Sequence, residues 1–221
     1  MIKHDTEMPG VSHRDEYTRI APVYDAVVGP FLRPVHAAVA AALRSGPIQP
    51  GDTVVDLCCG TGVLADMVAR AGLNVVDVVG VDNSPAMLNR ARARGGGARY
   101  LLVDASATGL ESGRFAGCAI SFALHEKPPE TGQAILAEAR RLVRPGGLVV
   151  VADYRVAQGT WLAGVAIALA ERLAGSEHHA CFRHFMEGGG CAPFLARSGL
   201  DAGEPLACFL GGRVGVYGVV L

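Results

Sequence analysis

Short apolar runs alternate along this chain with stretches whose apolar residues recur at helical spacing. The apolar runs, which predict strands, include 54–57, 100–103, 119–124 and 148–152. Strands that alternate with helices are typical of a parallel sheet covered by helices on both faces. Two further runs, Leu206–Leu210 and Val214–Leu221, flank a pair of glycines and predict an antiparallel hairpin near the C-terminal end.

The predicted helices carry start and stop signals. Ser84 is a good N-cap with Pro85 at the first helical position, and Gly95 ends the helix that they begin. Gly72 ends the helix before it. The predicted helices are 35–43, 63–71, 85–94, 130–143, about 158–174 and 193–198.

The most informative stretch joins the first strand to the helix that follows it. Its sequence, VVDLCCGTG at 54–62, ends an apolar strand with a carboxylate and continues into a tight glycine turn. Gly60 and Gly62 let the backbone approach a ligand closely, and the next helix offers unpaired N–H groups at its N-terminus. The pattern predicts a loop that binds a nucleotide cofactor.

Taken alone, this loop also fits a dinucleotide such as NAD. Gly60, Gly62 and Ala65 match the G-x-G-x-x-A fingerprint, and Asp82 follows 20 residues after Gly62, where an acid that binds ribose is expected.

Acids at successive strand ends favour S-adenosylmethionine (SAM) instead. Asp56 can meet a cationic amino acid moiety, whereas a pyrophosphate has no use for a carboxylate there. Asp104 ends another apolar strand and precedes the small Ala105, which suits the rim of an adenine ring. With Asp82, these acids match the ammonium, the exocyclic amine and the ribose diol of SAM.

The motifs resemble those of class I SAM-dependent methyltransferases and are similar to the ubiquinone and menaquinone biosynthesis family. The matching segments, in the family's order, are Tyr17 with Tyr24-Asp25, DLCCGTG at 56–62, GVDNSPAML at 80–88, Asp104-Ala105 and LVRPGG at 142–147. The resemblance covers about residues 17–153. It implies a doubly wound, Rossmann-like α/β fold of seven mostly parallel strands that closes with the C-terminal antiparallel hairpin.

The resemblance also implies a cofactor site. Its expected residues are Tyr17, Tyr24, Asp56, Cys58, Gly60, Gly62, Asp82, Asn83, Asp104 and Ala105. Cys58 stands where the family has its first glycine. The N-terminal segment, 1–46, is expected to cover the cofactor, although both of its tyrosines could instead be packing residues. Asp82 has an alternative role too, as a cap of the helix that begins near Ser84.

Substrate choice is expected to be encoded in 154–200, where the resemblance is loose, as a lid over the substrate. The residues expected to contact the substrate are His178, His179, Phe182 and His184. His125 follows the fourth strand at the carboxyl edge, where open α/β sheets bind ligands. It could take a proton as general base while the methyl group arrives, and the alternative is a purely structural histidine.

No metal is expected. The histidines and cysteines at 178–191 match no recognised zinc spacing, and methyl transfer from a sulfonium needs no Lewis acid. The uncharged run 161–170 is too short to span a bilayer, which needs about 20 apolar residues. It is expected to be a buried helix, a pocket wall or a weak membrane contact for a lipid substrate.

Composition narrows the class of protein. At 221 residues, without a repeat or a linker, the chain 1–221 is expected to form a single domain. A net charge of −1 offers no electrostatic basis for binding nucleic acid. The six cysteines show no disulfide pattern and indicate a reducing compartment. Because the polar N-terminus also lacks the apolar core of a signal peptide, we expect a cytoplasmic protein.

The expected function is SAM-dependent methyl transfer to a small apolar or aromatic molecule, of which a quinol is one candidate. Two alternatives stay open: N- or O-methylation of a polar metabolite, and a non-catalytic partner protein that binds SAM. The sequence leaves the acceptor atom and the oligomeric state open, because in-line displacement needs alignment more than a diagnostic catalytic side chain.

Overall fold

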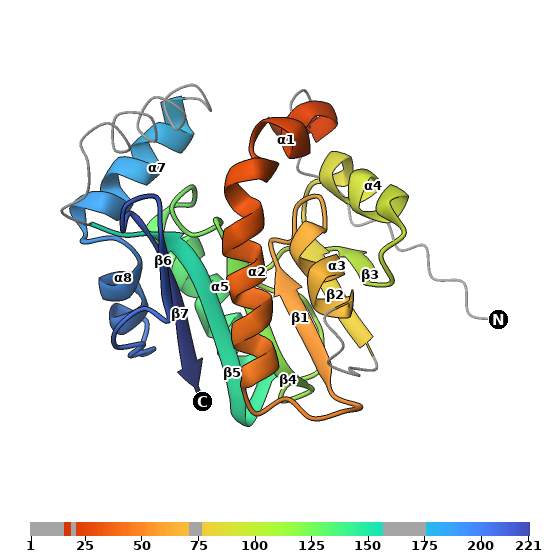
Figure 1. Ribbon diagram of the computed structural model, residues 1–221. Coiled ribbons are helices and arrows are strands. Elements are labelled where there is room, and N and C mark those ends of the chain that lie inside the picture. The colour runs from red at the N-terminus through yellow and green to blue at the C-terminus, as the bar shows by residue number, and fades with distance from the viewer. Residues whose placement is uncertain (1–15, 19–20, 71–76, 157–175) are drawn as a thin grey trace.

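Figure 1 shows the computed structural model, which describes residues 16–18, 21–70, 77–156 and 176–221. Its helices are η1 (Glu16–Thr18), α1 (Ala21–Val27), α2 (Gly29–Ser45), α3 (Val63–Arg70), α4 (Pro85–Arg94), α5 (Pro129–Leu142), α7 (Ser176–Glu187) and α8 (Cys191–Arg197). Its strands are β1 (Thr53–Leu57), β2 (Asp77–Asp82), β3 (Arg99–Leu102), β4 (Phe115–Ser121), β5 (Val143–Tyr154), β6 (Ala207–Phe209) and β7 (Val214–Val220). The helix expected at about 158–174, with the apolar run 161–170, lies outside the described residues.

The seven strands form one sheet in the order β3-β2-β1-β4-β5-β7-β6. Strands β1 to β5 are parallel, and β7 runs antiparallel to both of its neighbours. The chain moves outward from β1 to β3 and then returns to place β4 on the other side of β1. This reversal makes the β1–β4 crevice a switch point, where open α/β sheets bind ligands beyond the carboxyl ends of the strands. The predicted fold is confirmed.

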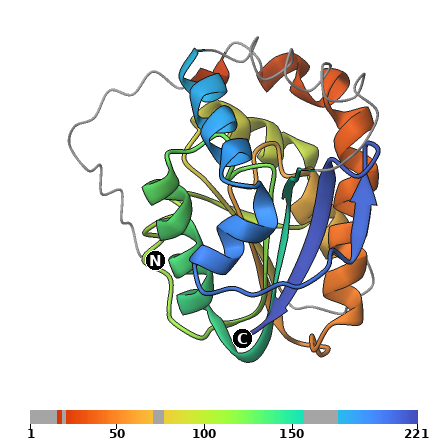
Figure 2. The same cartoon turned by 90° about the vertical axis from the view of Figure 1, so that its left-hand side faces the viewer.

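Helices cover both faces of the sheet (Figures 1 and 2). The buried side chains under α2 and α3 include Val35, Val39, Leu43, Leu64 and Val68. Those under α5 and α8 include Ile135, Leu136, Leu142, Phe194 and Leu195. Each such side chain contributes about 1.5–3 kcal/mol by leaving water, so the two layers hold the sheet rigid beneath its carboxyl edge. Helices α1 and α7 lie at that edge (Figure 1).

The caps of α4 form as predicted. Ser84 Oγ accepts a hydrogen bond from the Met87 N–H at 3.1 Å. Gly95 has the left-handed φ of 66° that ends a helix, and its N–H donates to the Arg92 carbonyl. These local signals therefore determine where α4 begins and ends.

The predicted fourth strand, 119–124, is wrong in its bounds, because β4 covers Phe115–Ser121. The chain leaves the sheet at Phe122, where φ is 53°. The turn beyond it stays in the core, since Ala123 and Leu124 are 2% and 1% exposed. A buried turn prolongs the apolar run, so the hydrophobic pattern could not mark the end of the strand. Helix α2 also begins earlier than predicted, at Gly29.

No single helix in the described part of the chain is long and apolar enough to cross a membrane. Among the described helices, α1 and α2 taken together are long and apolar enough, but a bend of 76° separates them.

A buried carboxylate ties α5 to the loop after β3. Glu138 accepts hydrogen bonds from the Thr108 N–H at 2.9 Å and the Thr108 hydroxyl at 2.5 Å. Arg141 donates to both of its oxygens at 2.7 Å. The Arg141 guanidinium, with the bonds from Thr108, outweighs burial and lowers the pKa of Glu138 to about 2. The loop carries Asp104, so this anchor supports one wall of the candidate site.

We expect Glu138→Gln to lower the free energy of unfolding by about 1–3 kcal/mol at neutral pH, because an amide cannot satisfy all of these donors. The folded pKa of Glu138 lies below its ordinary value of 4.5, so the ionised form stabilises the fold above that pH. This contribution disappears as the pH falls towards about 2. Urea unfolding of both proteins from about pH 7 to about pH 3 should show the difference narrowing. A difference independent of pH would contradict the assignment, and Glu130→Gln, on the exposed first turn of α5, is the control.

Candidate active site

A cavity of about 780 Å³ opens at the carboxyl edge of the sheet. This volume is typical of sites for small molecules and cofactors. Its walls come from the ends of β1, β2 and β4 and from the N-terminal helices. The predicted cofactor residues that line it are Tyr17, Tyr24, Asp56, Cys58, Gly60, Asp82, Asn83, Asp104 and Ala105. The fold therefore gathers residues from five separate segments around one space.

The loop between β1 and α3 has a left-handed backbone at three positions. The φ angles are 60° at Cys58, 54° at Gly60 and 76° at Gly62. Cys58 keeps this conformation although it replaces a glycine, at a cost of about 1–3 kcal/mol for a residue with a side chain. The substitution therefore leaves the turn intact.

Gly62 serves packing rather than the cavity. A Cβ atom placed on it would lie 2.9 Å from the Ala91 Cβ and closer still to the Tyr100 ring. Its neighbours Thr61 and Val63 line the cavity and Gly62 does not. The sequence correctly singled out this glycine, but the structure shows that it lets the loop pack against α4 and β3.

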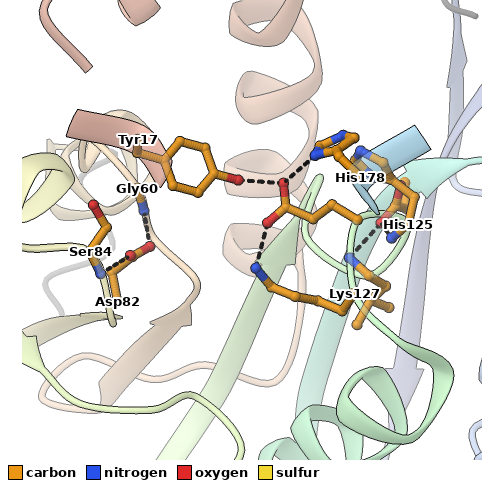
Figure 3. Close-up of polar contacts among 10 residues, drawn as sticks. Tyr17, Gly60, Asp82, Ser84, His125, Lys127 and His178 are labelled. Atoms are coloured by element: carbon orange, nitrogen blue, oxygen red, sulfur yellow. Dashed lines mark hydrogen bonds and ion pairs between the residues drawn. The ribbon is translucent and has the colours of Figure 1, made fainter. Parts of the chain in front are cut away.

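Asp82 joins the glycine loop to the start of α4. Its Oδ2 accepts a hydrogen bond from the Gly60 N–H at 2.8 Å, and its Oδ1 accepts one from the Ser84 N–H at 2.9 Å (Figure 3). Burial raises the pKa of Asp82, and the two backbone hydrogen bonds oppose that rise. Ser84 caps α4, and Asp82 binds the N–H of that cap residue instead of capping the helix itself. The Asp82 side chain also lines the cavity.

Asp56 is a buried carboxylate, one oxygen of which is unpaired within the described residues. In the sheet register it lies between Gly80 and Ala119, and it is 2% exposed. Its Oδ2 has no hydrogen-bond partner among the described residues. Burial and then the charge of Asp82 raise its pKa to about 8. A buried carboxylate oxygen without a partner favours a cationic group beside it. Asp56 therefore fits the ammonium of SAM.

Asp104 and Asn83 form the exposed rim of the cavity. Asp104 Oδ1 accepts hydrogen bonds from the Ser106 N–H at 2.8 Å and the Ser106 hydroxyl at 2.7 Å. These bonds shape the turn after β3, and the buried Ala105 forms the adjoining wall. A flat apolar wall beside a carboxylate suits an adenine ring.

Helix α1 is fastened over the glycine loop by an aspartate that sequence reasoning did not single out as a site residue. Asp25 accepts a hydrogen bond from the Thr61 hydroxyl at 2.6 Å. Arg94, near the end of α4, forms a short ion pair with the same carboxylate. These contacts bring Tyr24, the neighbour of Asp25, to the cavity. The Tyr24-Asp25 pair in the sequence was the available signal.

On the β4 side, the residues that line the cavity include Phe122 and Glu126. The Tyr17 hydroxyl donates to Glu126 Oε2 at 2.5 Å, and Lys127 Nζ donates to Oε1 at 2.7 Å. His178 Nδ1 lies 3.7 Å from Oε2. Burial alone would raise the pKa of Glu126, but the Lys127 ammonium and the other neighbours hold it below its ordinary value. A buried anion therefore faces the cavity wall at the end of β4.

His125, the predicted general base, is not among the residues that line this cavity. Its side chain is 5% exposed, and its Nδ1 lies 2.7 Å from Asp153 Oδ1. Asp153 Oδ2 also accepts the N–H groups of Leu124 and His125. The carboxylate at the end of β5 thus fixes the turn that carries His125 and Glu126, of which Glu126 lines the cavity and His125 does not. The sequence pattern gave no means to tell which of these two neighbours would line it.

The predicted lid residues on α7 fall into different environments. His178 reaches Glu126, as described above. Phe182 is buried, with its ring 5.3 Å from that of Tyr154, and His179 stacks on it at 6.4 Å. His184 is exposed and lines a separate hollow of about 270 Å³ between α5, α7 and α8. None of the four lines the main cavity, so their contact with a substrate stays a prediction.

Three of these groups also have the spacing of metal ligands. One ligand atom each from His125, Glu126 and His178 lies within 4.8 Å of the others. Within the described residues this is a different set from the cluster at 178–191 that the sequence suggested. Lys127 already supplies a cation to Glu126, and it would repel a divalent ion. We keep the expectation that no metal binds here.

Residues 54–147 match a protein family described as a methyltransferase domain. The chain is also 30% identical over 180 residues to the 2-phytyl-1,4-naphtoquinone methyltransferase of Trichormus variabilis. The aligned region covers 74% of this chain and 77% of that protein. This chain belongs to the class I SAM-dependent methyltransferases. Other relatives are named demethylmenaquinone methyltransferases. The chain spans about half the length of several relatives, 51% of one from Synechocystis sp. and 42% of one from Beutenbergia cavernae.

Solved structures agree with this family. DhpI, determined as a complex with SAH, is 25% identical with a TM-score of 0.54, over 63% of this chain and 66% of DhpI. A methyltransferase of Haloferax volcanii bound to the Trm112 activator is 19% identical with a TM-score of 0.65, over 95% of this chain and 99% of that one. The second likeness shows the fold alone. The family and the SAH complex of DhpI identify SAM as the cofactor of this methyltransferase.

We expect cofactor binding by this methyltransferase to depend on pH, because Asp56 has an unpaired oxygen at the cavity. Because the pKa of Asp56 is raised to about 8, the carboxyl group is largely protonated at about pH 6. A cationic ligand favours its ionised form, so we expect the affinity for S-adenosylhomocysteine, which shares the amino acid moiety, to rise between about pH 6 and about pH 7.5. Asp56→Asn should weaken binding and flatten this rise. Calorimetry measures both. Wild-type affinity and an unchanged pH profile in the variant would contradict the assignment, and Asp104→Asn, on the exposed rim, is the control for the pH profile.

Proposed function

We propose that this methyltransferase acts on a small aromatic acceptor that carries a hydroxyl group, with a reduced quinone as the leading candidate. The observation that carries the proposal is the aromatic wall that Phe122 forms, backed by further rings, next to a buried anion on the β4 side of the cavity. Phe122 lines the cavity, and its ring lies 5.5 Å from that of Tyr154. Tyr154 in turn contacts Phe182 and His125 at 5.3 and 4.7 Å. Such a wall suits a flat ring, and Glu126 beside it suits a hydroxyl.

The relatives support the same class of acceptor. The Trichormus protein is named for a phytyl naphthoquinone, and several others are named for demethylmenaquinone. Identity to the first is 30%, which supports a shared reaction class and leaves the side chain of the acceptor open.

Methyl transfer makes modest demands on the protein. When bound, SAM supplies a sulfonium methyl group, which the acceptor takes by in-line displacement. The chain contributes alignment of the acceptor against the cofactor and exclusion of water from the cavity. We place the cofactor over the acids at the ends of β1, β2 and β3. The acceptor then lies towards the ends of β4 and β5, where the aromatic wall and Glu126 face the cavity.

His125 is the candidate for removing the acceptor proton. Asp153 Oδ1 lies 2.7 Å from its Nδ1, on a strand that ends beside the acceptor side of the cavity. A carboxylate on the far nitrogen orients an imidazole and stabilises its protonated form. The His125 ring lies 6.4 Å from Phe122 of the cavity wall, so it is within reach of the acceptor side.

The acceptor is tested by a turnover assay with labelled SAM. We expect a short-chain demethylnaphthoquinol, kept reduced with dithionite, to be methylated, and the oxidised quinone not to be, because only the reduced ring is nucleophilic. Phosphoethanolamine represents the polar amine acceptors and should give no product. A chelator is expected to leave turnover unchanged. Methylation of the amine alone would overturn the proposal, and methylation of neither would leave a protein that binds SAM without this activity.

A second experiment tests His125. If His125 is a general base, His125→Ala and His125→Gln should both lower kcat by about 10²–10⁴-fold with little change in SAM affinity. Gln can hydrogen-bond but cannot take the proton. Near-normal turnover in the Gln variant alone would make His125 a positioning residue, and near-normal turnover in both would make it structural. His184→Gln, an exposed histidine of α7, is the matched control.

A further inference from the structure

Glu126 has properties that point to a specific contact with the acceptor. It faces the cavity on the acceptor side, its side chain is 12% exposed, and its charge is maintained by Lys127. Lys127 binds Oε1 at 2.7 Å, so Oε2 is the oxygen left for other donors. A buried carboxylate oxygen of this kind is a strong acceptor for a hydroxyl.

The donor that occupies Oε2 is itself a phenol. Tyr17 comes from η1, 109 residues away in the sequence, and its hydroxyl lies 2.5 Å from Glu126 Oε2. Burial, followed by the charge of Glu126, raises the pKa of Tyr17, so the hydroxyl keeps its proton and donates. Figure 3 shows the Tyr17 ring between Gly60 and Asp82 on one side and Lys127 and His178 on the other. The ring thus crosses from the cofactor side of the cavity to the acceptor side.

We infer that Glu126 Oε2 is the binding site for the hydroxyl group of the acceptor, and that the Tyr17 phenol occupies this site until the acceptor arrives. The inference rests on the proposed aromatic, hydroxylated acceptor and names the residue that would recognise it. The exchange replaces one phenolic hydrogen bond to the same oxygen by another. Glu126 therefore never becomes a buried anion without a donor, a state that would be costly.

The neighbours of Glu126 keep its carboxylate in place during this exchange. Lys127 holds Oε1, and His178 Nδ1 lies 3.7 Å from Oε2, so the anion keeps a cation and a polar neighbour when Tyr17 leaves. The hydroxyl of the bound acceptor would then lie near His178 and the His125–Asp153 pair, since the two imidazole rings are 5.6 Å apart.

A matched pair of ligands tests the inference without turnover. The SAH complex of the protein is titrated with 2-naphthol and with 2-methoxynaphthalene, which keeps the rings but cannot donate a hydrogen bond. We expect 2-naphthol to bind about 10-fold more tightly or better, as is typical of a hydrogen bond to a charged acceptor. Glu126→Gln should reduce this preference to less than about 3-fold, whereas Glu130→Gln, an exposed charge change four residues away, should not alter it.

Tyr17→Phe supplies a second test that keeps the ring and its packing. Removing the internal competitor should lower the dissociation constant of 2-naphthol by about 3–10-fold and leave that of 2-methoxynaphthalene unchanged. Tyr24→Phe removes a hydroxyl from the same segment and should give no such gain. If Tyr17 only latches the N-terminal segment over the cofactor, Tyr17→Phe would instead weaken SAH and both naphthalenes together.

Equal affinity of the wild-type complex for the two naphthalenes, or no binding of either, would overturn the inference. So would an unchanged preference in Glu126→Gln. Should that variant fail to fold by circular dichroism, Tyr17→Phe decides alone. The proposed function can fail separately. If the protein prefers 2-naphthol but does not methylate a demethylnaphthoquinol, the quinol is not the acceptor, whereas the hydroxyl-binding role of Glu126 still holds.

Discussion

The carboxylate of Asp82 is the contact on which the cofactor side of this protein depends. It accepts the N–H of Gly60 with one oxygen and the N–H of Ser84 with the other, at 2.8 and 2.9 Å. It therefore sets the separation between the glycine loop and the start of α4. The left-handed backbone of Cys58 is tolerated because this bond, and the packing of Gly62 against Tyr100, hold the loop from both ends. The cavity exists because these backbone segments cannot collapse towards each other.

The sheet order divides the cavity chemically. The acids at the ends of β1, β2 and β3 lie on one side of the switch point, and Phe122 and Glu126, after β4, lie on the other. The first side holds the three carboxylates that are predicted to meet the ammonium, the ribose and the amine of SAM. The second holds Phe122 and the buried carboxylate of Glu126. Two covering segments, η1 with α1 and helix α7, meet this boundary through Tyr17, Asp25 and His178.

Much of this arrangement could be read from the sequence, because its signals are local. Helix α4 begins after Ser84 because that side chain accepts a hydrogen bond from the backbone N–H three residues later. It ends at Gly95 because glycine readily adopts the positive φ found there. The parallel sheet follows from the alternation of apolar runs with helical spacing. All but one of the predicted cofactor residues line the cavity, since parallel strands necessarily bring their carboxyl ends to one edge. Gly62 is the exception, because a glycine required for packing looks the same in the sequence as one required for a ligand.

The sequence by itself thus determined the fold, the cofactor and the strand ends at which its site is predicted. The tertiary structure alone decided which residues after β4 line the cavity. His125 and Glu126 are adjacent, and their turn is fixed by Asp153, 27 residues or more away on β5, which binds its backbone. The partners of Glu126, Tyr17 and His178, come from segments on either side of it in the chain. Capping and periodicity act within a few residues, whereas these contacts arise only once the sheet has placed distant turns at the same edge.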